Sequence, residues 1–229
     1  MKNGKIYGAP SSYPRTLLRK AIERLIFFSI IAAIGLVGSV LHLVKSTEVN
    51  RIFSLVGFVA VFFALVEIVS ARVRISTSLS GIRSEQLVSH YIESKTNYNL
   101  IKGALLKGRK GDFDQILIGD NIVVIETKSG RGVVSNPRSG KIAVDGKEMY
   151  RFPLVQARKQ SQFISKLTNK SVIPILCVIN QTNPVVKFEG VYVTGLKDLG
   201  NLLSTLPRSL SPEEKDIITE KILNEIEEN

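Results

Sequence analysis

Two strand-like segments, 112–118 and 122–128, are separated by only three residues, Gly-Asp-Asn at 119–121, and this spacing is the feature that most constrains the fold. Gly, Asp and Asn favour tight turns, and a short loop of them between two strands is typical of a β-hairpin. The isoleucines and valines of both segments fall on both faces of the expected strands. A strand that is apolar on both faces lies in the centre of a sheet, so we expect a buried hairpin.

In a hairpin symmetric about Asp120, Asp114 lies opposite Glu126, and Asp112 lies opposite Lys128. Side chains alternate along a strand, so Glu126 and Lys128 also share one face. Directly opposed carboxylates have Cβ atoms about 5 Å apart, which destabilises a sheet. Burying two such carboxylates costs several kcal/mol unless a cation joins them. A divalent metal with oxygen ligands would resolve this conflict, and the alternative is a carboxylate–lysine ion pair at the rim of the sheet.

Asp114 followed by Glu126-Thr127-Lys128 resembles the core of the PD-(D/E)XK nucleases. The wider segments 111–114 (Gly-Asp-Phe-Asp) and 125–130 (Ile-Glu-Thr-Lys-Ser-Gly) are similar to those of the nuclease-related domain (NERD) family. The resemblance covers most of residues 80–225. It implies a restriction-endonuclease-like α/β fold, in which a mixed sheet is flanked by helices.

The resemblance also implies roles for individual residues. Asp114 and Glu126 would hold Mg²⁺ or Mn²⁺, with Glu85 of the first helix as a further candidate ligand. Lys128 would orient or activate the attacking water, and Gln156 would steady the site or the substrate. These assignments make the chain a metal-dependent nuclease candidate.

The later helix departs from the family pattern at two points. The family tends to have Asn-Pro at the start of this helix, and the chain has Phe152-Pro153. Gln156 and Gln160, at positions i and i+4, share one helical face and resemble the Gln-x-x-x-Tyr element of related nucleases, with Gln in place of Tyr. We expect this change to affect contacts with nucleic acid rather than the metal ligands.

The remaining elements of the domain follow from periodicity and turn signals. The domain is expected to be α/β with a mixed sheet. Glycine-rich residues 129–132 are interpreted as a turn. The expected elements are a helix over 80–94, a β-meander over 98–145, a helix over 153–167, strands at 172–179 and 191–194, a short helix at 196–203, and a last helix beginning at Pro212 after a Ser211 N-cap.

Two apolar runs precede this domain, at 25–44 and 52–71. Each is long enough to cross a bilayer of about 30 Å, so they predict a transmembrane hairpin, with a buried core helix as the alternative. The flanks at 1–24 and 72–84 are rich in Lys and Arg. The positive-inside rule then predicts a multi-pass protein of the cell membrane, with both termini and the 80–229 domain in the cytoplasm and 1–24 as a cytoplasmic basic segment.

The composition excludes several classes of site. One Cys and two His rule out disulfide frameworks and Cys- or His-rich metal centres, which leaves carboxylates as metal ligands. The net charge is +11, and residues 95–170 hold 15 Lys and Arg against 6 acidic residues. Such a field suits the phosphate backbone of nucleic acid, although a solvated surface or anionic lipid heads would also explain it. As the nucleic-acid partner we expect DNA more than RNA. Candidate phosphate contacts are Lys107, Arg109, Lys110, Arg131, Arg138, Arg158 and Lys159.

The sequence therefore predicts a membrane-anchored, metal-dependent nuclease that hydrolyses nucleic-acid phosphodiesters. The alternative is a non-catalytic, membrane-tethered module on the same fold that binds nucleic acid or protein.

Overall fold

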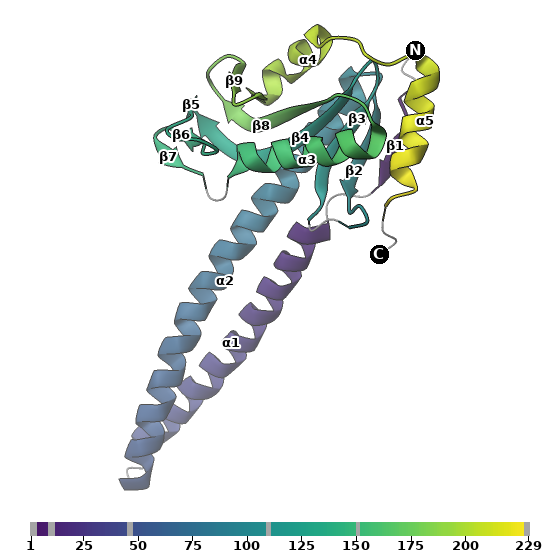
Figure 1. Ribbon diagram of the computed structural model, residues 1–229. Coiled ribbons are helices and arrows are strands. Elements are labelled where there is room, and N and C mark those ends of the chain that lie inside the picture. Colours follow the sequence, from purple (N-terminus) through teal and green to yellow (C-terminus); the bar gives the residue numbers. More distant parts are fainter. Residues whose placement is uncertain (1–3, 9–11, 45–47, 109–110, 150–151, 227–229) are drawn as a thin grey trace. The chain divides into compact units, whose positions relative to one another are not determined.

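The structure is a computed structural model that describes residues 4–8, 12–44, 48–108, 111–149 and 152–226, without the side chains of 12–15, 38–44, 48–57 and 60. The chain divides into two compact units. One comprises Met1–Tyr13 with Gly81–Asn229, and the other comprises Pro14–Ser80. Figure 1 shows the helices and strands with the labels used below.

The unit Pro14–Ser80 consists of helix: most of α1 (Ser12–Val44) and the first part of α2 (Glu48–Lys95). Over the side chains that the structure describes, no helix is both long enough and apolar enough to cross a membrane. The predicted transmembrane hairpin is therefore not supported. Much of its two spans, 25–44 and 52–71, falls on side chains outside the description, at 38–57 and 60. The predicted cellular location is not tested by this finding and stays a prediction.

The other unit is built on a seven-stranded mixed sheet, which confirms the predicted α/β class. Its strand order is β1-β2-β3-β4-β8-β10-β9. Strands β2, β3 and β4 are antiparallel, β4, β8 and β10 are parallel, β1 is parallel to β2, and β9 is antiparallel to β10. The strands are β1 (Ile6–Gly8), β2 (Asn99–Ala104), β3 (Phe113–Ile118), β4 (Ile122–Gly132), β8 (Val172–Gln181), β9 (Val186–Phe188) and β10 (Val191–Thr194). A small second sheet contains β5 (Val134–Ser135), β6 (Ala143–Val144) and β7 (Lys147–Glu148).

Helices cover both faces of the large sheet, as Figure 1 shows. On one face, Leu117, Val123 and Ile125 pack with the end of α2 and with α4 (Leu196–Thr205). The opposite face packs against α3 (Pro153–Thr168) and α5 (Pro212–Leu223). The predicted helices at 80–94, 153–167 and 196–203 are confirmed. The predicted cap of the last helix is also confirmed, because Ser211 forms a capping box with Glu214.

The register of the β3–β4 hairpin is the predicted one, since Gln115 pairs with Ile125 and Ile118 pairs with Ile122. The predicted turn at 129–132 is wrong. Instead, β4 continues to Gly132 beside β8, with a shift of register between Lys128 and Arg131. Such a β-bulge absorbs an extra residue without ending the strand, so glycines there need not mark a turn.

Candidate active site

Glu126 is the most buried charged group of the candidate site. It lies within β4, and only 1 % of its surface is exposed. Both of its carboxylate oxygens have partners: Lys128 Nζ donates to Oε1, and Gln160 Nε2 donates to Oε2 at 2.9 Å. Glu126 and Lys128 share one face of the strand, as the alternation of side chains predicts. The carboxylate is therefore held in one orientation from two sides.

Asp114 lies one pair further along the register than Gln115 and Ile125, which brings it opposite Glu126. Its Oδ2 accepts a hydrogen bond of 2.7 Å from the backbone N–H of Thr127. Among the residues that the structure describes, Oδ1 has no hydrogen-bond donor. Asp114 thus offers one oxygen that is fixed by the backbone and one that is open to a ligand.

The surroundings of Asp114 disfavour its charged form. Burial contributes most, followed by repulsion from the carboxylates of Glu126 and Glu85, and together these raise its pKa well above the usual range. Attraction to Lys128 and the Thr127 N–H act in the opposite direction but do not outweigh them. The positive charge near these three carboxylates is therefore too small to balance their negative charge.

Lys128 supplies the positive charge at this point. Burial acts to lower its pKa, but the carboxylates of Glu126, Asp114 and Glu85 outweigh burial and raise it above the usual value. The side chain keeps 27 % of its surface exposed. Lys128 therefore carries an ammonium group at neutral pH that both contacts Glu126 and can be reached from solvent.

Glu85 belongs to the part of α2 that packs on the sheet. Together with Asp114 it lines a cavity of about 240 Å³, which Ser89, His90 and Glu93 also line. Its backbone carbonyl accepts a hydrogen bond from Gln115 Nε2 at 3.3 Å, which ties α2 to β3. The site can therefore be reached between α2 and the start of β3. His90 is exposed on this helix.

Of the two glutamines on α3, it is Gln160 rather than Gln156 that reaches the site. Gln156 has no side-chain hydrogen bond to any residue that the structure describes. Gln160 is buried, and its Nε2 donates to Glu126 and, at 3.4 Å, to the Asp112 carbonyl. Its Oε1 is buried and has no hydrogen-bond partner among the described residues. The shared helical face made both residues candidates, and the packing of α3 on the sheet brings Gln160 to Glu126.

The donor set is compatible with a hard divalent cation. Mg²⁺ and Mn²⁺ prefer carboxylate oxygens, and the raised pKa of Asp114 marks a cluster that lacks positive charge. Asp114 and Glu126 could hold such an ion as a pair. Within the described part of the chain, no group of three or more His, Cys, Asp or Glu side chains is placed to hold a metal. The assignment of Glu85 as a further ligand stays a prediction, and its carboxylate acts on the pKa of Asp114 by repulsion.

The cations predicted to contact phosphate differ in whether they already have a partner within the protein. Arg138 pairs with Glu148 at 3.0 Å, and Arg158 pairs with Glu189 at 2.8 Å. Lys107 donates to the Asn224 carbonyl. Arg131 and Lys159 are exposed and have no ion pair with a described residue, while Arg109 and Lys110 lie outside the description.

Cys177 takes no part in the site. It is fully buried in β8, and burial raises the pKa of its thiol to about 12. A thiol with this pKa stays protonated and unreactive at neutral pH.

The fold and site thus define an α/β domain whose buried carboxylates and lysine lie on two paired central strands. Comparison with known families is consistent with this class. Residues 80–189 match the family model of the nuclease-related domain (NERD). The match extends from the end of α2 past β9, so it includes every residue of the candidate site. No curated protein and no solved structure matches the chain.

Proposed function

We propose that the chain is a divalent-metal-dependent nuclease that hydrolyses phosphodiester bonds of nucleic acid, DNA in preference to RNA. The observation that carries the proposal is the opposed pair of half-buried Asp114 and buried Glu126, with Lys128 beside it. The match to the nuclease-related domain suggests the same kind of function.

Each residue of the site has a distinct role in this proposal. Asp114 and Glu126 would hold Mg²⁺ or Mn²⁺, which when bound lowers the pKa of a water and neutralises charge on a phosphate. Lys128, kept protonated by its carboxylate neighbours, would stabilise negative charge that develops on the phosphate. Gln160 is a positioning residue, because it acts on the substrate only through the orientation of Glu126.

One observation favours a second candidate function. Both oxygens of Glu126 already have protein partners, so an ion pair with Lys128 could satisfy the carboxylate without a metal. A chain of this kind would bind nucleic acid or a protein without cleaving it.

Cleavage assays on the purified full chain separate the two candidates. We expect cleavage of DNA with Mg²⁺ or Mn²⁺ and none with a chelator present. Asp114→Asn and Glu126→Gln keep the size of the side chain and should each lower cleavage by about 100-fold or more. Asp216→Asn, an exposed change of the same kind on α5, is the matched control and should cleave like the unaltered chain.

Two results would contradict the proposal. If the folded chain cleaves neither DNA nor RNA with any divalent metal, the non-catalytic function replaces it. If both Asp114→Asn and Glu126→Gln cleave as well as the control, the activity belongs to another site.

A further inference from the structure

A second cavity, of about 530 Å³, lies where three parallel strands end. It is bounded by the end of β8 at Gln181, by the start of α4 at Leu196, and by Arg131 near the end of β4. In sheets of this kind, ligands bind at the carboxyl ends of the parallel strands, where loops and helix starts leave room. The position alone makes this cavity a candidate ligand site.

The two cations that line the cavity have no acidic partner. Arg131 and Lys197 are exposed, and neither forms an ion pair with any residue in the described ranges. The lining contains no Asp or Glu side chain. An anion entering the cavity would meet two positive charges that have no ion pair with a described residue.

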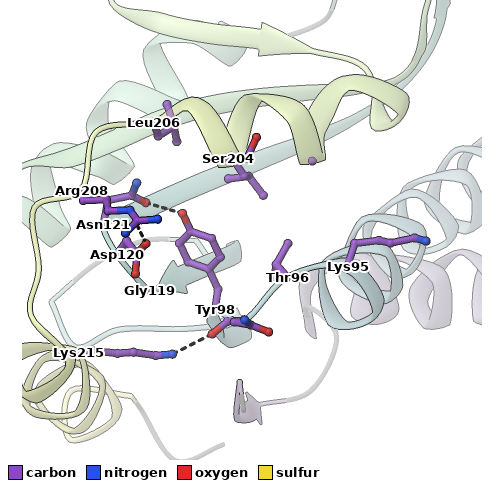
Figure 2. A pocket seen from close by; sticks show the side chains of 13 residues that line it. Lys95, Thr96, Tyr98, Gly119, Asp120, Asn121, Ser204, Leu206, Arg208 and Lys215 are labelled. Atoms are coloured by element: carbon purple, nitrogen blue, oxygen red, sulfur yellow. Dashed lines mark hydrogen bonds and ion pairs between the residues drawn. The ribbon is translucent and has the colours of Figure 1, made fainter. Parts of the chain in front are cut away.

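The cavity shown in Figure 2 is a useful contrast. It measures about 340 Å³ and lies at the β3–β4 turn. Its polar groups already bind one another: Arg208 pairs with Asp120 at 3.1 Å, and Lys215 donates to the Asn97 carbonyl at 2.8 Å. A ligand there would have to replace existing contacts, whereas Arg131 and Lys197 have no ion pair with a described residue that a ligand would have to break.

The start of α4 adds donors to the second cavity. Its N-cap is Gly195, which has no side chain to satisfy the first backbone N–H groups of the helix. Free N–H groups at a helix start attract anions. Asp198 in the first turn offsets part of this attraction, so the two cations carry the argument and the helix start supports it.

Gln181 forms a fixed wall of the cavity. Its side chain is 8 % exposed. Its Nε2 donates to the carbonyls of Asn183 at 3.1 Å and Pro184 at 3.5 Å, which fixes the orientation of the amide. The side chain also lies against Gly195, where an added Cβ would be 3.1 Å from Gln181 Cγ. Its Oε1 is buried, with no hydrogen bond to a described residue, and is shielded from a ligand in the open cavity.

We propose that this cavity binds a nucleotide through its phosphate, which Arg131 and Lys197 hold. The choice of a nucleotide rests on the proposed function, whose substrate and products carry phosphate. The cavity is separate from the carboxylates, because Glu126 faces α3 whereas the cavity lies on the face of the sheet that α2 and α4 cover.

Binding measurements on the full chain test this without relying on cleavage. Affinity for a labelled single-stranded oligonucleotide and for a nucleoside monophosphate is measured with a chelator present. Arg131→Ala with Lys197→Ala should weaken both affinities by about tenfold or more at low salt. Lys166→Ala with Lys221→Ala removes the same charge from exposed positions on α3 and α5, and should weaken them by less than about threefold.

Two results would overturn the inference. Equal losses in the two double variants would mean that binding follows diffuse charge. No loss in the Arg131 and Lys197 variant would mean that the cavity does not hold the phosphate.

The failure of this inference and that of the proposed function can be told apart. If the chain cleaves DNA but the Arg131 and Lys197 variant binds like the control, only the nucleotide cavity is wrong. If the chain never cleaves but this variant alone loses nucleotide binding, the cavity stands and the nuclease function falls.

Discussion

The first half of β4, Ile122 to Thr127, is buried and carries the carboxylate of Glu126, whereas the second half, Lys128 to Gly132, reaches solvent and carries two cations. The buried half faces Asp114 and lacks positive charge. The exposed half ends beside a cavity that contains no acidic side chain. In our proposals, the first half of β4 thus helps to hold a cation and the second half, a few residues later, helps to hold an anion.

This difference shows how burial gives two parts of a single strand different binding properties. Carboxylates withdrawn from water are costly unless a cation joins them, so the buried half favours metal binding. An exposed cation without a partner costs little free energy, so the exposed half can keep unpaired cations that are available to a phosphate. A metal-dependent nuclease needs both properties close together, and the bulge after Lys128 lies at the change from one to the other.

The largest expected effect distinguishes the two halves of β4 by their influence on cleavage rate and on affinity. Lys128→Met should lower the single-turnover cleavage rate by about 100-fold or more, because it removes the charge beside the phosphate. Arg131→Ala should weaken oligonucleotide affinity and leave that rate within about threefold. Thermal unfolding of both variants is the control for folding, since loss of one partner of a buried ion pair costs about 3–5 kcal/mol. If the two variants affect rate and affinity alike, the two halves are not distinct.

Metal binding should stabilise the chain through the buried half alone. At a Mn²⁺ concentration about 100 times its Kd, binding to the folded state adds about 2.7 kcal/mol. For a domain of this size, that amounts to a rise in Tm of about 5–10 °C. Asp114→Asn and Glu126→Gln should abolish the rise, and Arg131→Ala should keep it. A rise that persists in both carboxylate variants would place the ion elsewhere.

Gln160→Leu should destabilise the metal-free chain by about 1–3 kcal/mol, because Glu126 Oε2 would lose its donor inside the protein. Gln156→Leu, one turn away and without a side-chain hydrogen bond to a described residue, is the matched control and should change stability by less than about 0.5 kcal/mol. Urea unfolding measures both. Equal effects would mean that the contact with Glu126 contributes nothing.

The smallest expected effect concerns the pH dependence of stability. Folding raises the pKa of Asp114, mainly through burial, so the folded chain binds its proton more tightly than the unfolded chain. Stability without metal should therefore fall as the pH rises above about 4, the usual range for an Asp carboxyl. Asp114→Asn removes this titration and should be more stable than the unaltered chain at neutral pH. The difference should disappear near pH 4, and a variant that is less stable at neutral pH would contradict the raised pKa.

Much of the large sheet could be predicted from the sequence because its signals are local. The Gly-Asp-Asn turn set the hairpin register, and the Ser211-Pro212 pair marked the start of α5. Strands β1 and β9 escaped prediction, since three residues are too few for a periodic pattern. The pairing of β1 with β2 joins segments far apart in the chain, and nothing near residues 6–8 signals that partner.

The sequence by itself determined that Asp114 and Glu126 would oppose each other, because the residue count of a tight hairpin fixes its register. It could not determine which glutamine of α3 contacts Glu126, since Gln156 and Gln160 share one helical face. Only the packing of α3 on the sheet decided that Gln160 does so. Nor could the sequence bring Arg131, Gln181 and Lys197 to one cavity. Their proximity depends on parallel strands whose ends meet only when the sheet is assembled.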